Sequence, residues 1–414
     1  MAALLVTLVT ACGGGGGGPA PAPSSPPGSN VLAVTVDAGP ANTGYNVNRL
    51  YTTVRVCQPG TSQCKDIDHV LVDTGSFGVR LLSSVLTPDL NLTRLTGAGG
   101  FPLLNCAQFV DNTVAWGPVA TADIKLGGMT AANMPIQVVG DPAFNSLATV
   151  ATPLGTVPCS GSAMITARDL GANGILGIGL LKDDCGPDCA LNPHNDRYYT
   201  CTTASCTATK GATASLAQQV KNPVSLFAAN YNNGLLIDLQ SASSAAAPSL
   251  SGSLIFGIGT QSNNQLASGT GTVLTTDSSG YITTRLGSQT LTKSFIDSGS
   301  NGLFFDSTTI PQCIESPGFY CPVPFANFSA TLVDANGVSS PVFSFSVDNA
   351  TTLFASRTNA DLNHVFPTLA GDFGDAQTFD WGLPFFYRRR VFFGIEGQAS
   401  TIGASSVTGP FYAF

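Results

Sequence analysis

A short acidic phrase occurs twice in the 414-residue chain, once in each half. The first copy is Val70-Leu71-Val72-Asp73-Thr74-Gly75-Ser76, and the second is Ser294-Phe295-Ile296-Asp297-Ser298-Gly299-Ser300. In each copy an apolar, strand-like run delivers one aspartate into a turn made of Thr or Ser, Gly and Ser. Two carboxyls a few ångströms apart cannot both ionise easily, so one keeps its proton while the other acts as a base. The repeat therefore predicts a paired general acid and base, one from each of two similar lobes.

Glycine occupies the second position after each aspartate, at Gly75 and Gly299. Glycine permits the tight turn that brings the carboxyl forward, where a Cβ would clash or forbid the required backbone φ. A water molecule held between Asp73 and Asp297 would lose a proton to one carboxylate as it attacks an electrophilic carbon. The protonated partner would donate to the oxygen that becomes negative. Because the pair titrates jointly, the sequence does not assign the proton to either aspartate.

Hydroxyl groups flank both aspartates. Thr74 and Ser298 directly follow the acids, and we expect their hydroxyls to hold the two loops together across the interface between the lobes. Ser76 and Ser300 are expected to donate hydrogen bonds to the outer carboxylate oxygens, which favours ionisation of whichever aspartate acts as the base. These four hydroxyls would keep the two carboxyls coplanar.

The elements that must position these residues are predicted to be strands. Strand-like runs are separated by Gly, Asn, Asp and Pro; examples are residues 50–56, 135–139, 252–257 and 391–395. Helical periodicity is scarce, and its best example, Ala214 to Val220, ends before Pro223. The chain is longer than a single core usually grows. We therefore expect an all-β protein with an N-terminal lobe at 31–222 and a C-terminal lobe at 223–414.

The composition indicates a turn-rich exported protein. Hydrophobic residues make up 43% of the chain and charged residues only 10%, so Gly, Ser, Thr and Asn supply most of the polarity. The net charge of −8 argues against nucleic acid or an anionic membrane surface as a partner, because both select clustered Lys and Arg. None of the three histidines lies near a nucleophile motif. We expect a monomer that needs no cofactor and no metal.

The N-terminus indicates where the protein resides. Residues 2–11 form an apolar or small stretch that is too short to span a bilayer and is typical of a signal peptide. Its end, Leu8-Val9-Thr10-Ala11-Cys12, resembles a bacterial lipobox, in which the cysteine is lipidated and becomes the mature N-terminus. No Lys or Arg precedes the stretch, which departs from that pattern. The alternative is an ordinary signal peptide with a chance cysteine.

Residues 13–30 read as a linker, with six glycines followed by a Pro-rich run. A flexible chain of this length reaches about 25 Å on average. The expected location is therefore the bacterial cell envelope, with a globular body tethered to the membrane by lipid on Cys12 and facing the periplasm or the cell surface.

Ten further cysteines, an even number, suit an oxidising compartment and predict up to five disulfides. Cys57 with Cys64 and Cys313 with Cys321 look like local staples, which leaves Cys106 to pair with Cys159. The remaining four are expected to pair among themselves, or alternatively to bind zinc with His194: Cys185, Cys189, Cys201 and Cys206.

The two acidic phrases resemble the paired active-site motifs of the pepsin-like aspartic peptidases. Further landmarks follow in the order of that family, at residues 173–179, 224–227, 252–257, 381–386 and 401–403. More narrowly, the chain is similar to DUF3443, a bacterial family of exported lipoproteins of unknown function. That similarity lies in the Trp-Gly-Pro-Val segment 116–119 and the Ile-Asp-Ser-Gly-Ser-Asn-Gly segment 296–302.

The resemblance implies a bilobal fold of two related barrel-like lobes, with a polypeptide bound in the cleft between them. It implies that Asp73 and Asp297 activate a water molecule for hydrolysis of a peptide bond. Peptidases of this family carry a tyrosine in the flap over the cleft, whereas residues 108–113 contain none. Phe109 or Trp116 is expected to cover the cleft instead.

A second departure lies in the closing strand, where Asp380 stands at a position expected to be apolar. Together with the unusual flap, it leaves a second function open. The chain would then be a non-catalytic envelope protein that binds peptide or glycan in the cleft.

Overall fold

The computed structural model describes residues 29–145, 159, 161–193, 196–202, 211–266, 271–355, 362–403 and 405–414. Cys12, most of the expected linker, His194 and Cys206 lie outside these residues, so the expectations for them stay predictions. Among the described residues, no helix is long and apolar enough to cross a membrane.

The described part of the chain is built almost wholly of strands, which form sheets of fifteen, seven and two members. Its α-helices have at most five residues: α1 (Ser83–Leu86), α2 (Ala167–Leu170), α3 (Pro187–Leu191) and α4 (Ala350–Phe354). Short 3₁₀ turns occur at Ala98–Gly100, Pro223–Leu226, Ser262–Asn264 and Leu383–Phe385. The predicted all-β fold class is confirmed.

The predicted helix at 214–220 is wrong, because the segment makes only a turn. The backbone N–H groups of Gln218 and Gln219 both donate to Ser215 O. The Gln219 side chain donates to the carbonyls of Gly186 and Ala214. These bonds stabilise the single turn, and the segment does not continue as a helix.

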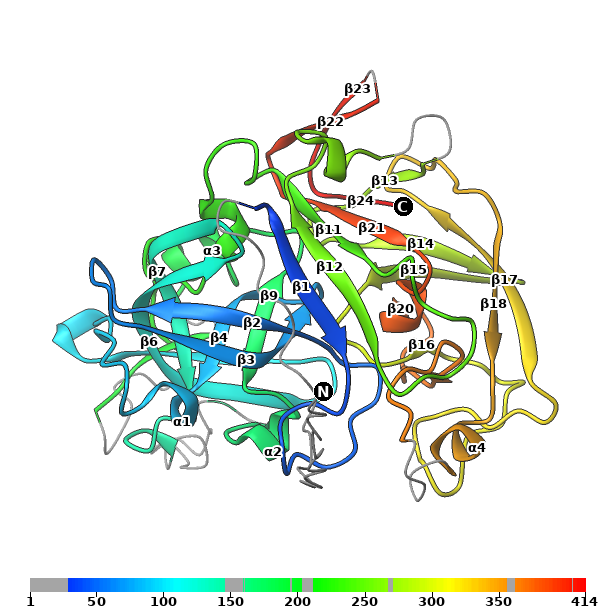
Figure 1. Ribbon diagram of the computed structural model, residues 1–414, viewed down its shortest axis with the longest axis horizontal. Helices are drawn as coiled ribbons and strands as arrows, with labels where there is room; N and C mark the ends of the chain where they lie inside the picture. Colours follow the sequence, from blue (N-terminus) through cyan, green and yellow to red (C-terminus); the bar gives the residue numbers. More distant parts are fainter. Residues whose placement is uncertain are drawn as a thin grey trace, which may run out of the picture.

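Six strands of the first half close into a barrel (Figure 1), each hydrogen-bonded to the next and the last to the first. In ring order they are β2 (Leu50–Cys57), β3 (Cys64–Asp73), β9 (Gly174–Ile178), β4 (Phe77–Leu82), β7 (Met129–Val139) and β6 (Thr113–Leu126). Three more strands extend the sheet beside β6, namely β5 (Leu103–Gln108), β10 (Tyr198–Thr200) and β8 (Ser162–Ala163).

The same sheet continues into the second half of the chain through β1 (Val31–Val36). All six residues of β1 pair with β12 (Leu250–Phe256), whereas only two pair with β2. The continuation then runs through β11 (Gly234–Asp238), β21 (Arg390–Gly394), β24 (Phe411–Ala413) and β13 (Val273–Thr275). The two halves are therefore joined by main-chain hydrogen bonds at the centre of the molecule (Figure 1).

The seven-stranded sheet forms the second barrel-like layer. Its order is β18 (Phe343–Val347), β17 (Ala326–Val333), β14 (Ile282–Leu286), β15 (Gln289–Ile296), β20 (Phe379–Trp381), β16 (Leu303–Phe305) and β19 (Ala370–Gly371). Stacked aromatic rings fill its core, with centroids 4.7 Å apart for Phe305 and Phe379 and 3.8 Å apart for Phe379 and Trp381. A separate hairpin joins β22 (Ala399–Ile402) to β23 (Ser405–Thr408).

Corresponding three-strand units occur in the two halves. In the first, β9 runs parallel to β3 and antiparallel to β4, and in the second, β20 runs parallel to β15 and antiparallel to β16. The central strands are buried on both faces and therefore need no alternation of polar residues. The first strand of each unit leads directly to one of the repeated aspartates, which fixes where the two carboxyls lie.

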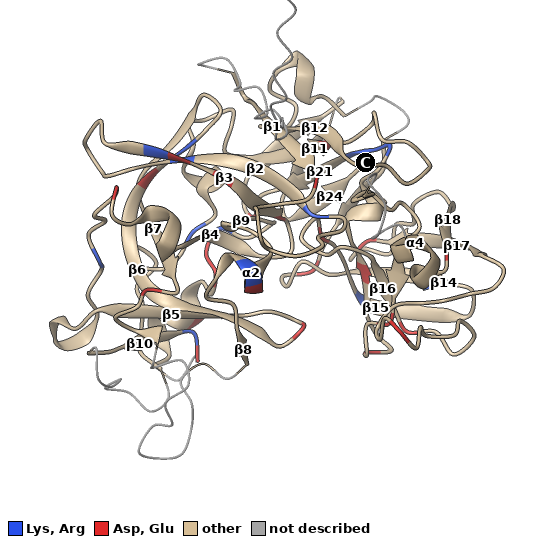
Figure 2. Cartoon of the chain, turned by 60° about the horizontal axis from the view of Figure 1, so that its bottom comes forward, with Lys and Arg blue, Asp and Glu red and all other residues tan. Residues whose placement is uncertain are grey.

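Charged residues are sparse and in several places paired. Figure 2 shows blue and red segments side by side on β2 and β3, where Arg55 lies 3.2 Å from Asp66. That pair is exposed and contributes little to stability. The Arg80–Asp184 pair is buried in the first half, with 3.3 Å between the guanidinium and the carboxylate.

The structure contains the disulfides that the cysteine spacing predicts as far as the described residues reach. Four bonds join cysteines that are both described: Cys57–Cys64, Cys106–Cys159, Cys185–Cys189 and Cys313–Cys321. Cys201 is also disulfide-bonded. Because Cys185 and Cys189 are joined to each other, they are not thiolate ligands, which argues against the zinc alternative.

Candidate active site

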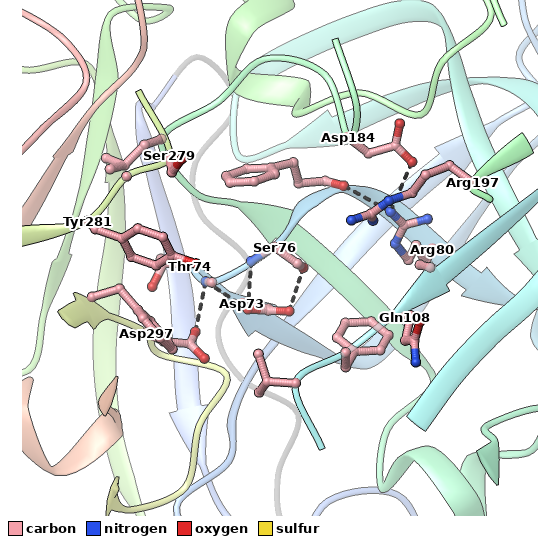
Figure 3. A pocket seen from close by; sticks show the side chains of 18 of the residues that line it. Asp73, Thr74, Ser76, Arg80, Gln108, Asp184, Arg197, Ser279, Tyr281 and Asp297 are labelled. Atoms are coloured by element: carbon pink, nitrogen blue, oxygen red, sulfur yellow. Dashed lines mark hydrogen bonds and ion pairs between the residues drawn. The ribbon is translucent and has the colours of Figure 1, made fainter. Parts of the chain in front are cut away.

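The two repeated aspartates meet between the halves of the molecule. Asp73 is the last residue of β3, and Asp297 directly follows β15, where its N–H donates to Trp381 O. Both side chains are buried, with only 6% of Asp73 and 8% of Asp297 exposed. Figure 3 shows the carboxyls approaching each other from separate strands.

Each carboxyl accepts hydrogen bonds from its own turn. Asp73 Oδ1 accepts from the N–H groups of Gly75 at 2.9 Å and Ser76 at 3.2 Å, and Asp73 Oδ2 accepts from the Ser76 hydroxyl at 2.5 Å. Asp297 Oδ1 accepts from Gly299 N at 2.7 Å, and Asp297 Oδ2 accepts from the Ser300 hydroxyl at 2.8 Å. The two serine hydroxyls thus lie on corresponding oxygens of the pair.

One backbone N–H connects the two acids. Gly75 N donates to Asp73 Oδ1 and also, at 2.8 Å, to Asp297 Oδ1. A Cβ on Gly75 would lie 2.6 Å from Asp297 Cγ, and one on Gly299 would lie 2.7 Å from Asp73 Oδ1. Neither glycine has a positive φ. Close approach of the opposite aspartate, rather than an unusual φ, is therefore what requires glycine here.

The hydroxyls of Thr74 and Ser298 cross between the halves. Ser298 N donates to Thr74 Oγ1 at 2.8 Å, and Thr74 N donates to Ser298 Oγ at 3.2 Å. The Ser298 hydroxyl in turn donates to Val72 O, and the Thr74 hydroxyl to Ile296 O. This reciprocal set, which we call the cross-lock, holds the two aspartate turns in a fixed relation.

Burial raises the pKa of Asp73 to about 8, and the neighbouring charge of Asp297 adds to the rise. The Ser76 hydroxyl opposes it by stabilising the ionised form. Because Gly75 N donates to an oxygen of each carboxyl, the two acids lie close enough together to share one proton. The pair is therefore suited to carry one proton and one negative charge through the neutral range.

Two cavities, of about 320 Å³ and about 410 Å³, flank the pair. Asp73, Asp297, Phe109 and Val110 line both of them. Phe109 and Val110 belong to the tip of the β5–β6 hairpin, and Val110 is 76% exposed. The hairpin tip therefore covers the dyad with apolar side chains.

The expectation that Trp116 covers the cleft is wrong. Trp116 is fully buried, its indole N–H donates to Phe144 O at 2.9 Å, and its ring packs edge-on against Tyr199. It belongs to an apolar cluster with the Cys106–Cys159 disulfide. A tryptophan that satisfies its N–H internally stabilises this side of the lobe and takes no part in the cleft.

Several lining residues carried no recognisable sequence signal. In the smaller cavity, Arg80, Asp184, Arg197 and Tyr281 lie around Asp73 (Figure 3). The Arg80 guanidinium donates to the side chains of Asn105 and Gln137 and pairs with Asp184. These partners are distant in sequence and come together only through strand pairing. Only Val110 could have been suspected from the sequence, because an apolar residue at the turn of a hairpin indicates a contact with a ligand or with another part of the chain.

A model of the family described as "Protein of unknown function (DUF3443)" matches residues 26–414. The chain belongs to the DUF3443 family. Among solved structures, this DUF3443 protein is similar to the aspartic proteinase from Irpex lacteus at 14% identity, with a TM-score of 0.48, over 92% of this chain and 96% of that one. No curated protein matches the sequence.

Proposed function

We propose that this DUF3443 protein is an aspartic-type endopeptidase. The observation that carries the proposal is the Gly75 N–H, which donates to the Oδ1 atoms of both Asp73 and Asp297. It holds two buried carboxyls, each with three hydrogen-bond donors, at a distance where they share one proton. Such a pair can act as base and acid in the same step.

In the proposed reaction, a water molecule between the carboxyls attacks the carbonyl carbon of a peptide bond. The ionised carboxyl takes a proton from the water, and the protonated one donates to the carbonyl oxygen, which gives a neutral tetrahedral diol. The protonated carboxyl then donates its proton to the amide nitrogen, one hydroxyl of the diol gives its proton to the ionised carboxyl, and the C–N bond breaks to release a carboxylic acid and an amine. The dyad ends with one proton, as it began, and the cross-lock keeps the carboxyls oriented throughout.

The substrate proposed is a polypeptide in an extended conformation. The cavities on either side of Asp73 and Asp297 give room for residues on both sides of the scissile bond. The apolar hairpin tip with Phe109 and Val110 would close over the chain and exclude water other than the attacking molecule.

We further propose that the protein works at the bacterial cell envelope, as a monomer held by lipid on Cys12. The lipobox-like Leu8 to Cys12 run and the Gly/Pro-rich linker support this location, and the disulfides agree with an oxidising compartment.

One observation favours the alternative of a non-catalytic protein that binds peptide or glycan. The hairpin tip carries Phe109 and Val110 but no phenol in residues 108–113 that could hydrogen-bond to a bound chain. Such a hairpin would still cover a bound peptide or glycan without assisting its cleavage.

Digestion of a denatured protein between about pH 3 and pH 8, with and without a statine-containing inhibitor, tests the proposal. We expect cleavage that the inhibitor abolishes, because statine mimics the tetrahedral diol. Absence of inhibitable cleavage across this range would favour the binding protein.

A further inference from the structure

Asp380 is a third carboxyl beside the dyad, at a position that is apolar in the other half of the molecule. In the first unit, Ile175 on β9 pairs with Leu71 on β3. In the second unit, Asp380 on β20 pairs with Phe295 on β15 in the same register, two residues before the catalytic aspartate. The corresponding strands thus place an isoleucine in one half and an aspartate in the other.

Asp380 is only 1% exposed, and its Oδ1 atom has no hydrogen-bond partner among the residues that the structure describes. It lines the cavity of about 410 Å³ together with Asp297 and Ser300. An ionised carboxylate with an unsatisfied oxygen at such a buried site would be strongly unfavourable. The neutral acid is the form that this environment accepts.

The Ser300 hydroxyl explains what a neutral Asp380 does. Ser300 lines the same cavity as Asp297 and Asp380, and its hydroxyl donates to Asp297 Oδ2 at 2.8 Å. A hydroxyl has one proton and two lone pairs. While Ser300 donates to Asp297, it has no proton left for an ionised Asp380, whereas a neutral Asp380 can donate to a lone pair of Ser300.

The charged and titratable neighbours agree with this assignment. Asp297 and Asp73 line the same cavity as Asp380. The buried Tyr412 phenol on β24 is close enough to interact electrostatically with Asp380, and it donates to Gly280 O. Burial, followed by the charge of Asp297, raises the pKa of Asp380 well above its usual range. The other charged residues of the cavity are Arg49, Asp111 and Asp372. Arg49 donates to Leu170 O.

We propose that Asp380 is a positioning residue that stays protonated while the dyad works. It donates to Ser300 and so keeps the Ser300 hydroxyl directed at Asp297 Oδ2. A hydroxyl that accepts one hydrogen bond donates a stronger one. Asp380 therefore stabilises the ionised form of Asp297 without adding a charge of its own. The effect on catalysis rests on the proposed peptidase function, whereas the protonation state does not.

Infrared spectroscopy of the folded protein at about pH 6 tests the protonation state without any turnover. The Asp73→Asn variant removes the proton shared within the dyad. We expect it to retain a protonated-carboxyl band, and we expect Asp73→Asn combined with Asp380→Asn to lose that band. Asp73→Asn combined with Asp238→Asn is the control, because Asp238 pairs with Arg390 outside the cleft, and it should retain the band. A band that is absent from Asp73→Asn, or that survives Asp380→Asn, would overturn the proposal.

The pH profile of cleavage tests the positioning role. Asp380→Ile introduces the residue found at the corresponding position of the first half, Ile175, and removes the donor to Ser300. The midpoint of the acid limb of the pH–rate profile should therefore rise by roughly 0.5–1 pH unit. Asp380→Asn keeps a neutral donor and should leave the limb where it is in the wild type. Equal shifts in both variants, or none in either, would refute the role. A chain that cleaves nothing would contradict the peptidase proposal but would leave the infrared result intact.

Discussion

At the scale of single residues, burial of Asp73 outweighs the hydrogen bonds that its carboxyl accepts. Each carboxyl accepts three hydrogen bonds, yet burial raises the pKa of Asp73 to about 8. A carboxyl with a raised pKa binds its proton more tightly in the folded state than in the unfolded chain. The free energy of unfolding therefore falls as pH rises from about 4 to about 8.

The Asp73→Asn variant should remove this pH-dependent loss. Relative to the wild type, it should gain stability as pH rises, by on the order of 1–3 kcal/mol between about pH 4 and pH 7. Urea unfolding of both proteins at the two pH values measures the difference. A difference that is constant with pH would mean that Asp73 is ionised throughout this range.

The sequence was sufficient to predict that the two aspartate turns meet, but not which residues surround them. The two aspartate turns are local motifs, so Thr74, Ser76, Ser298 and Ser300 could be assigned positions beside the acids from spacing alone. Trp116 could not be placed, because an aromatic residue on a strand has the same pattern whether it faces the cleft or the interior. The departure at Asp380 was visible as a residue type, but its register opposite Phe295 was not.

At the scale of elements, the dyad depends on two equivalent strand units held together by the cross-lock. The unit of the first half supplies Thr74 and that of the second supplies Ser298, so each loop satisfies the buried N–H of the other. A buried N–H that loses its acceptor destabilises the fold by about 1–3 kcal/mol.

Thr74→Val keeps the shape of the side chain but removes the acceptor for Ser298 N. We expect it to lower the free energy of unfolding by about 1–3 kcal/mol and to reduce cleavage, because the carboxyls lose their fixed orientation. Thr74→Ser retains the hydroxyl and serves as the matched control. Thermal melts and cleavage rates of the two variants decide the point, and equal behaviour would show that the cross-lock hydroxyl is dispensable.

Apolar runs bounded by turn residues were sufficient to predict strands at 50–56, 252–257 and 391–395. The pairing of β1 with β12 could not be predicted in the same way. Val31 pairs with Ile255, which is far away in the sequence. No local pattern specifies which strand β1 will pair with.

At the scale of the whole molecule, the fold brings one aspartate from each half to a single cleft and is stabilised by covalent links. The Cys106–Cys159 bond closes the longest loop of the four bonds described here, and it lies beside Trp116. Loop closure of that length contributes about 4 kcal/mol, compared with about 2.5 kcal/mol for the loop of Cys313–Cys321. Such links suit the oxidising compartment proposed for this protein.

The proposed tether makes a prediction for the whole protein. Cys12→Ser should move the protein from the membrane fraction to the soluble fraction, because acylation supplies the anchor in the proposed arrangement. Fractionation in high salt, with mass spectrometry of the N-terminus, checks it. Retention of the serine variant in the membrane, together with a wild type that carries no lipid, would contradict the lipoprotein assignment.

The cleavage rate of the Asp297→Asn variant tests catalysis by the Asp73–Asp297 pair most directly. Asparagine keeps the size of the side chain but cannot take a proton from water, so cleavage should fall by at least about a thousandfold. Circular dichroism should show the wild-type fold, because the cross-lock between Thr74 and Ser298 is unchanged. A folded Asp297→Asn protein that cleaves at the wild-type rate would contradict catalysis by the Asp73–Asp297 pair.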